Sequence, residues 1–353
     1  MKQMGYSDAL VGVVASTEWL GLAVATPFVA LWVKQLGLSG AFLLSGLIQF
    51  GSYLLITVTP WPLVWGLLIF LSGVASCMRW IVAEACVAEL ATERSRGRTV
   101  GIFGTMISAT YIAGPAILSV IGTQGIQARY SQITALALAA LAVLLGAAMP
   151  RVTSKADKLS ESPARLGLMG ILDASRTAPI LLVSGLFGGF FDAGSTGLLP
   201  LFGLSMGIEG DQSALLISAC GLGGVLIMWP VGLLADRYAH RPIYLGCGAI
   251  AVVSCLTMLL VPLWHPLAFV IALVWGGCGG ASYTLAMVDA GKRGTGVELV
   301  NLTAVLILSY TIGGMIAPLM GGAALSLVPF WGLPILMTSF AAVVTLFIWN
   351  GEP

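Results

Sequence analysis

Charged residues are scarce in this chain. Only 9% of its 353 residues are charged, 58% are hydrophobic, and the mean hydropathy is +0.99. An average soluble domain is roughly 25% charged, so this composition cannot cover a water-facing surface. A soluble enzyme, a nucleic-acid binder and a disordered scaffold are therefore excluded, and the net charge of +1 offers no basic field to nucleic acid. The composition predicts a multi-pass integral membrane protein.

Several kinds of reactive site are also missing. The six cysteines stand singly in apolar runs without a Cys-x-x-Cys pair, and we interpret them as small buried hydrophobes. The two histidines, His240 and His265, fall in predicted loops on opposite sides of the membrane, which argues against a histidine-ligated metal or a Ser–His hydrolase. The chain has no Gly-x-x-x-x-Gly-Lys-Ser/Thr loop for ATP. We expect no metal, no cofactor and no enzymatic activity.

The apolar residues form long continuous runs, which favours helices over the short alternating strands of a membrane barrel. Eleven runs are long enough to span a bilayer, at about 10–33, 40–59, 62–88, 98–122, 131–149, 179–205, 213–234, 242–261, 266–288, 297–325 and 330–349. We predict an all-α protein with an N-terminal bundle of five helices (1–149), a cytoplasmic linker (150–178) and a C-terminal bundle of six helices (179–353). Within the linker, residues 165–176 form either a short interfacial helix or a solvated connection.

The cationic residues are distributed very unevenly between the two sets of loops. Thirteen of the 16 Lys and Arg residues fall on one set, two on the other, and Arg79 lies inside a span. Because cytoplasmic loops carry the excess of Lys and Arg, this split places the linker and the C-terminus in the cytoplasm. We expect a monomeric protein of the cell inner (plasma) membrane.

Two halves of the chain share landmarks at a constant offset of 203 residues. This offset superimposes Pro27 on Pro230, Lys34 on Arg237, Gly21 on Gly224, Gly73 on Gly276, and Pro115 on Pro318. Such an offset favours a parallel duplication, as in transporters built from two six-helix bundles. The second repeat begins near Pro179, so the counterpart of its first helix would precede Met1. We expect that helix to be missing from this sequence, through a misplaced start or a truncation. The alternative is a natural eleven-helix protein.

Residues 232–242 (GLLADRYAHRP) form a short predicted loop on the cytoplasmic side. They resemble motif A of the major facilitator superfamily, a Gly-x-Leu-Ala-Asp-Arg-x-x-x-Arg pattern with Gly232, Asp236, Arg237 and Arg241 in place. The glycine lets two helices approach closely. Asp236 at a helix end could pair with either arginine or with the N-terminus of a neighbouring helix, and so hold a gate shut. The resemblance implies a two-bundle fold and transport of a small molecule by alternating access.

The resemblance extends over nearly the whole chain and looks closest to the YcaD-like exporter branch. Residues 313–322 (GGMIAPLMGG) are similar to a helix-packing motif, Gly-x-x-x-Gly-Pro-x-x-Gly-Gly, that the family associates with efflux. Its packing positions here are Gly314, Pro318, Gly321 and Gly322, while Ala317 replaces a glycine. The loop 28–38, which corresponds to motif A in the first half, has no aspartate and only one cation, Lys34.

Ionisable residues within a span are costly and are functional candidates by default. Asp192 lies midway along its span beside glycines and Phe191, where it could bind substrate or a proton, or make a structural hydrogen bond. Glu18 and Arg79 are further candidates, although Glu18 could face a watery vestibule and Arg79 could snorkel to the interface. Asn301 and Tyr310 could meet substrate or serve polar packing between helices.

These observations predict a secondary active transporter that moves a small, amphipathic organic molecule by alternating access. Export and coupling to protons, with Asp192 or Glu18 as the carrier, are the finer expectations. The alternative is a truncated, non-transporting relic or a membrane assembly factor of the same fold, which the missing helix and the incomplete first motif A would favour.

Overall fold

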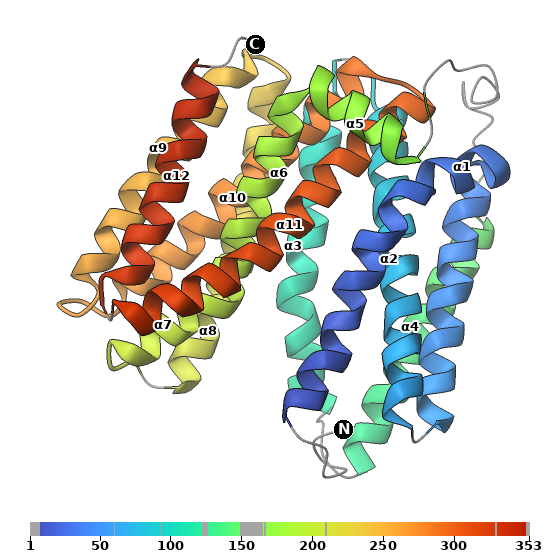
Figure 1. Cartoon of the computed structure of the whole chain (residues 1–353), viewed down its shortest axis with the longest axis horizontal. Coiled ribbons are helices and arrows are strands. Elements are labelled where there is room, and N and C mark those ends of the chain that lie inside the picture. The colour runs from blue at the N-terminus through green and yellow to red at the C-terminus, as the bar shows by residue number, and fades with distance from the viewer. Residues whose placement is uncertain are drawn as a thin grey trace. The chain divides into compact units, whose positions relative to one another are not determined.

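The computed structural model describes residues 8–59, 61–92, 94–121, 126–148, 165, 167–208, 210–328 and 330–350. Within these ranges the chain forms helices and no strand (Figure 1), so the predicted all-α class is confirmed. Eight of the described helices are long and apolar enough to cross a membrane, or nine if the bent pair α5 and α6 counts as one span. All eleven predicted runs fall on helical segments.

The helices fall into a first-half set and a second-half set along the chain. The first half holds α1 (Asp8–Val58), α2 (Pro62–Leu90), α3 (Arg96–Ile121), α4 (Ile126–Ala148) and the short α5 (Gly167–Thr177). The second half holds α6 (Pro179–Ala193), the π-helix η3 (Gly194–Leu198), α7 (Leu199–Ser205), α8 (Gly210–Ala235), α9 (His240–Thr257), the 3-10 turn η4 (Met258–Leu260), α10 (Leu267–Arg293), α11 (Val297–Leu327) and α12 (Gly332–Asn350). The second part of the predicted linker is therefore helical, as α5.

Contacts group the chain into two compact units, which we describe separately. Unit 1 comprises Met1–Glu89, Ala116–Thr177 and Gly294–Ala304, and unit 2 comprises Leu90–Pro115, Ala178–Arg293 and Val305–Pro353. Most of α3 thus belongs with the second-half helices, and the first turns of α11 belong with the first-half helices.

In unit 1, α1 contains two of the predicted spans. Gly37 has φ 69° and ψ 171°, which is not helical, and the chain turns back at this point (Figure 1). Glycine adopts positive φ without the steric cost that a Cβ would bring, so it suits this break. Both α4 and α5 pack against α1.

The α1–α2 contact in unit 1 recurs in unit 2 between α8 and α10. A Cβ added to Gly73 would lie 2.0 Å from the Glu18 carbonyl oxygen, and one added to Gly276 would lie 2.0 Å from that of Cys220. In the same way, a Cβ added to Gly21 would lie 2.1 Å from the Phe70 carbonyl oxygen, and one added to Gly223 would lie 1.9 Å from that of Leu273. The matching positions are 202 or 203 residues apart. The structural counterpart of Gly21 is thus Gly223, one residue before the position that the constant offset predicts.

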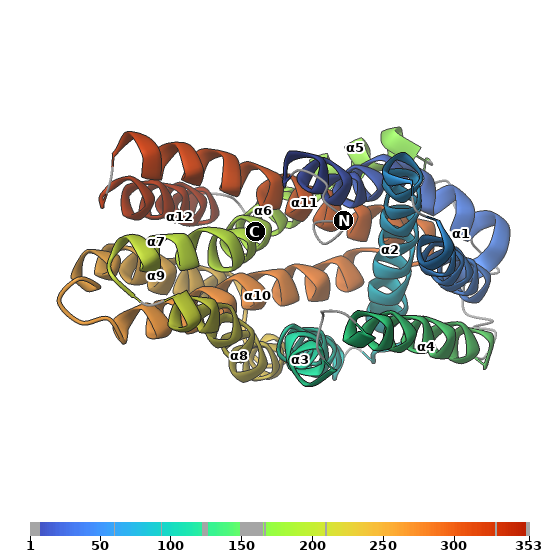
Figure 2. The ribbon, with the colours of Figure 1, turned by 90° about the horizontal axis from the view of Figure 1, so that it is seen from below.

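Unit 2 is built around α10, which packs against α6, α8 and α9, while α12 packs on α9 (Figure 2). Its core is rich in aromatic side chains. Phe190 stacks on Phe340 with ring centroids 3.8 Å apart, and Trp275 meets the ring of Phe191 edge-on at 5.4 Å. The Trp275 indole also donates a hydrogen bond to Ser254 at 3.1 Å, so its one polar group is satisfied.

Candidate functional site

Asp192 lies in unit 2 at the point where α6 changes into a π-helix. It is the penultimate residue of α6, and η3 begins two residues later at Gly194. The Thr196 hydroxyl donates to the Asp192 carbonyl at 2.9 Å, and the Ser195 hydroxyl donates to the Phe191 carbonyl at 2.8 Å. Single π-helical turns widen a helix locally and occur often at functional sites. Asp192 remains partly accessible, and no described lysine or arginine forms an ion pair with it.

Two glycines bring Tyr310 of α11 against the face of α6 that carries Asp192. A Cβ on Gly189 would lie 1.9 Å from the Tyr310 carbonyl oxygen, and one on Gly188 would lie 3.3 Å from the tyrosine ring. Gly189 and Asp192 are three residues apart, which places them on the same helix face. The side chains of Tyr310 and Asp192 are hydrogen-bonded to each other. The structure therefore joins two residues that the sequence nominated separately.

Tyr111 of α3 is a third member of this cluster, which sequence reasoning missed. Its hydroxyl is hydrogen-bonded to that of Tyr310, it lies within electrostatic range of Asp192, and it is 43% exposed. When Asp192 is ionised it can only accept, so Tyr310 then donates to Asp192 and the Tyr310 oxygen is left to accept from Tyr111. The result is a series of hydrogen bonds from a tyrosine of α3 to a carboxylate within the span. Tyr111 had no charge and no motif to mark it in the sequence.

Phe191 and Asn301 have other partners. Phe191 is fully buried in the core of unit 2, with its ring centroid 4.6 Å from that of Phe187. Asn301 is buried in unit 1, where its amide donates to the Arg165 carbonyl at 2.9 Å and touches Gly170 of α5. In this structure Phe191 packs the core, and Asn301 anchors the linker helix to α11.

The polar residues of unit 1 form a second network around Arg79. The Arg79 guanidinium donates to Gln49 at 3.3 Å and to Ser76 at 3.5 Å, and the Gln49 amide donates to Ser72 at 2.5 Å. Glu18 is exposed and lies within electrostatic range of Arg79, although the two form no ion pair within 4.0 Å. Sequence reasoning nominated both charges but missed Gln49, whose uncharged side chain orients the guanidinium.

In unit 2, Asp236 caps the N-terminus of α3. One of its carboxylate oxygens accepts from the Gly97 amide at 2.6 Å and the other from the Arg98 amide at 2.8 Å. The first amides of a helix have no partner within the helix, and the helix dipole favours an anion there. Of the three partners considered for Asp236, the structure therefore shows the neighbouring helix N-terminus. Arg241 instead donates to the Trp349 carbonyl of α12, and the Arg237 side chain is exposed.

Paired glycines make this capping contact possible. A Cβ on Gly97 would lie 2.2 Å from the Gly232 carbonyl oxygen, and one on Gly232 would lie 2.2 Å from the Gly97 carbonyl oxygen. The positions in the 313–322 segment differ among themselves. A Cβ added to Gly313 would meet the Leu186 carbonyl and one added to Gly321 would meet the Leu198 side chain. A Cβ on Gly314 would have ordinary space, and one on Gly322 would meet nothing within 4 Å. Pro318 lies inside α11.

A helical membrane protein with charged networks inside its spans, and a capped helix at a loop between spans, has the features of a membrane transporter. A family model described as Major Facilitator Superfamily matches residues 1–306. The chain therefore belongs to the major facilitator superfamily, and it is an integral, multi-pass membrane protein and a secondary transporter rather than an enzyme.

Individual relatives agree with this assignment. The chain is 27% identical over 316 residues to the uncharacterized MFS-type transporter YcaD of Escherichia coli O17:K52:H18, which covers 87% of this chain and 78% of that protein. Among solved structures it is similar to the E. coli fucose:proton symporter FucP, with a TM-score of 0.75, 14% identity and coverage of 98% of this chain and 92% of the other. It is also similar to the human organic anion transporter MFSD10, with a TM-score of 0.73, 14% identity and coverage of 96% and 83%. At such identities these two structures show the fold alone.

Proposed function

We propose that this transporter exports a small amphipathic organic molecule in exchange for protons, and that Asp192 is the group that binds and releases the proton. The observation that carries the proposal is the hydrogen-bonded series Tyr111, Tyr310 and Asp192 in unit 2. A carboxylate in a span without a basic partner is costly, and binding a proton or a cationic group relieves that cost. The two tyrosine hydroxyls supply a path along which a proton can reach the carboxylate.

Arg79 and Glu18 are proposed to contact substrate from unit 1. Their support is that two opposite charges lie within a span without a direct ion pair, while Gln49 and Ser76 orient the guanidinium. A guanidinium held in this way has donors left for an anionic or carbonyl group of a ligand. The fold neighbours do not narrow the substrate, because one is named for fucose and the other for organic anions.

Motif A is proposed to act as a gate on the cytoplasmic side. Its support is the cap that Asp236 places on α3, since a charge-assisted contact to free helix amides can be made in one conformation and released in another. Alternating access would then be a motion between a bundle of residues 1–149 and one of residues 179–353, with residues 150–178 as the linker. The uneven Lys and Arg distribution supports an inner-membrane location with a cytoplasmic C-terminus. The transporter is proposed to act as a monomer.

The relic or assembly-factor alternative is not favoured, because the relatives and the fold neighbours are named as transporters. Export rather than import rests only on the similarity of residues 313–322 to the family's efflux-associated motif.

Purified protein in proteoliposomes with an internal pH dye tests the proposal. A panel of amphipathic organic cations, anions and neutral compounds is added, and wild type is expected to give compound-dependent proton flux. Asp192→Asn should abolish that flux while retaining exchange of labelled against unlabelled substrate, because an amide keeps the shape of the site but cannot carry a proton.

Asp173→Asn, at a partly exposed carboxylate on α5, makes the same chemical change outside the cluster and should leave the flux unchanged. Equal proton flux in wild type and Asp192→Asn would remove Asp192 from the mechanism.

A further inference from the structure

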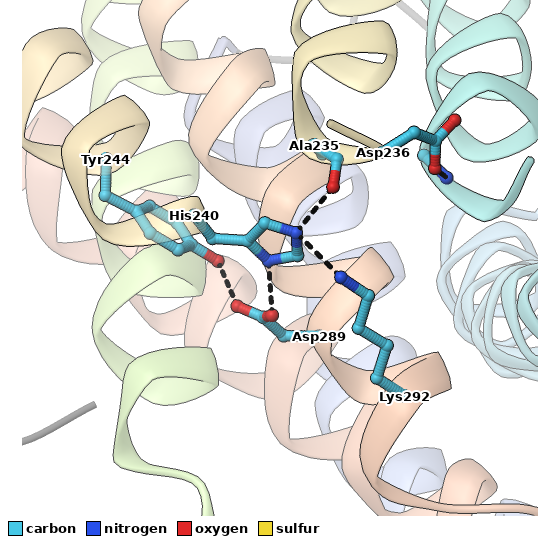
Figure 3. Close-up of polar contacts among 7 residues, drawn as sticks. Ala235, Asp236, His240, Tyr244, Asp289 and Lys292 are labelled. Atoms are coloured by element: carbon cyan, nitrogen blue, oxygen red, sulfur yellow. Dashed lines mark hydrogen bonds and ion pairs between the residues drawn. The ribbon is translucent and has the colours of Figure 1, made fainter. Parts of the chain in front are cut away.

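The imidazole of His240 lies between three polar partners at the start of α9 (Figure 3). Its Nδ1 is 2.5 Å from the Asp289 carboxylate on α10. Its Nε2 is 2.9 Å from the Ala235 carbonyl at the end of α8 and 3.0 Å from the Lys292 ammonium on α10. The cluster is largely enclosed, since the side chains of His240 and Asp289 are 10% and 16% exposed. His240 is not one of the residues that define motif A.

The partners of Nε2 suit opposite protonation states. Nδ1 faces a carboxylate, so it carries a proton in both states. When the ring is charged, Nε2 also carries a proton and donates to the Ala235 carbonyl. When the ring is neutral, Nε2 carries no proton and accepts a hydrogen bond from the Lys292 ammonium. In each state Nε2 can bond only one of these two neighbours, so the protonation state of the ring decides whether it bonds the Ala235 carbonyl or the Lys292 ammonium.

The other charged and titratable groups around the ring hold it in place. On α9, Tyr244 donates to the second oxygen of Asp289 at 3.0 Å, so both oxygens of that carboxylate are used. Arg241 is occupied by the Trp349 carbonyl of α12, and the arginine of α10 that follows Lys292, Arg293, lies within electrostatic range of Tyr244. At the end of α8, Asp236 is turned to α3 and Arg237 is exposed. Lys292 is thus the cation that contacts the ring directly.

The charged state connects this cluster to the cap on α3. Ala235 is the last residue of α8, and Asp236 follows it directly. A carbonyl at a helix end has no acceptor role within the helix, so a donor from outside restrains the residues around it. Protonated His240 restrains Ala235, and with it the carboxylate that binds the Gly97 and Arg98 amides. Neutral His240 has no proton to give to Ala235.

We propose that His240 is a proton-sensitive switch of the motif A cap, in which protonation from the cytoplasm strengthens the hold of Asp236 on α3. This inference rests on the gating role proposed above for motif A. It assigns regulation to a residue that is separate from the Asp192 cluster, so cytoplasmic acid would act at the gate as well as at the transport site.

The chain contains two histidines, which makes the first measurement direct. Protein labelled with carbon-13 at histidine Cε1 in lipid nanodiscs should give two resonances, and His240→Gln assigns them. His265 is exposed and serves as the internal reference. The His240 resonance is expected to titrate between about pH 5 and 8, the range where histidine changes charge. A His240 resonance that stays constant over this range would overturn the proposal.

The strength of the cap is measured by amide hydrogen exchange at the α3 N-terminus. Variants are compared with wild type at equal pH. Wild type should be protected about tenfold more at the acid end of the His240 titration than at the alkaline end, as expected for one charge-assisted hydrogen bond. His240→Gln should show low protection at both ends, and His240→Arg, which keeps a cation next to Asp289, should show high protection at both. Identical profiles for wild type and His240→Gln would also overturn the switch.

Asp236→Asn separates this inference from the proposed function. It should lower protection of α3 at every pH while the His240 resonance still titrates. Because neither measurement uses substrate, a failure of transport in proteoliposomes with an intact switch would count against the proposed transport reaction alone. The reverse result, normal proton-coupled transport with a silent His240, would count against the switch alone.

Discussion

At the scale of single residues, uncharged partners lie beside the membrane charges Asp192 and Arg79. Asp192 is met by Tyr310, and Arg79 by Gln49 and Ser76, while no described ion pair joins a charge of either network to an opposite charge. Hydrogen bonds to neutral groups orient a charge without cancelling it, so the charge stays available to a proton or a ligand. A tight ion pair at the same depth would satisfy both groups and leave nothing to bind.

Removing the Tyr310 hydroxyl should therefore uncouple Asp192 from its proton path. A hydrogen bond to a charged group contributes about 1.5–3 kcal/mol, and since about 1.4 kcal/mol corresponds to tenfold, Tyr310→Phe should reduce proton flux by about tenfold or more. The phenylalanine ring keeps the edge-on contact with Tyr283, whose centroid is 5.3 Å away.

Tyr130→Phe, at an exposed tyrosine of α4, provides the matched control, and proteoliposome proton flux is the measurement. Wild-type flux in Tyr310→Phe would show that the hydroxyl series is structural only.

At the scale of helices, glycine positions determine where two elements touch. Gly97 and Gly232 allow α3 and α8 to meet backbone to backbone, and this contact brings the Asp236 carboxylate to the α3 amides. Gly188 and Gly189 do the same for α6 and α11 at Tyr310. The distribution of glycine along these helices therefore has a direct chemical consequence, because it sets which polar side chains meet.

Adding a methyl group at the α3–α8 contact should weaken the cap. Gly232→Ala places a Cβ 2.2 Å from the Gly97 carbonyl, and backbone cannot move aside as a flexible side chain can. Overpacking of this kind costs about 1–3 kcal/mol, so we expect lower thermal stability together with faster hydrogen exchange at the α3 N-terminus.

Gly246→Ala in α9 is the control, because a Cβ there meets nothing within 4 Å. Equal stability and equal exchange in Gly232→Ala and Gly246→Ala would contradict the close contact.

At the scale of the whole molecule, the chain repeats one helix-pair contact in both halves. A Cβ added to Gly73 would lie 2.0 Å from the Glu18 carbonyl oxygen, and one added to Gly276 would lie at the same distance from that of Cys220. Equivalent contacts at nearly constant sequence separation are what a duplicated bundle requires. The two units therefore share an equivalent helix-pair contact as well as matching sequence positions.

This equivalence predicts similar effects from substitutions in the two halves. Gly73→Ala and Gly276→Ala should each destabilise the protein by about 1–3 kcal/mol, since both force backbone apart. Gly51→Ala in unit 1 and Gly322→Ala in unit 2 are matched controls with nothing within 4 Å, and thermal unfolding in detergent is the measurement. A loss of stability in only one of the two test variants would mean that the repeated contact stabilises only one half of the protein.

The sequence by itself determined that this is a helical membrane protein and that residues 232–242 resemble a family motif, and it predicted eleven spans and a repeat of the two halves. Hydropathy, glycine spacing and a short loop motif are local properties, and they persist whatever the neighbours are. Asp192, Glu18 and Arg79 were identified for the same reason, because a charge in an apolar run stands out along the chain.

Tertiary structure alone decided which residues meet. Tyr111 and Gln49 are neutral and unremarkable in sequence, yet each completes a network with a residue on another helix. Phe191 and Asn301 also lie in predicted spans, but Phe191 packs in the core of unit 2 and Asn301 bonds the Arg165 carbonyl before α5. His240 gains its three partners from α8 and α10. A side chain's direction around a helix depends on how that helix packs, and this is fixed by contacts between residues far apart in the chain.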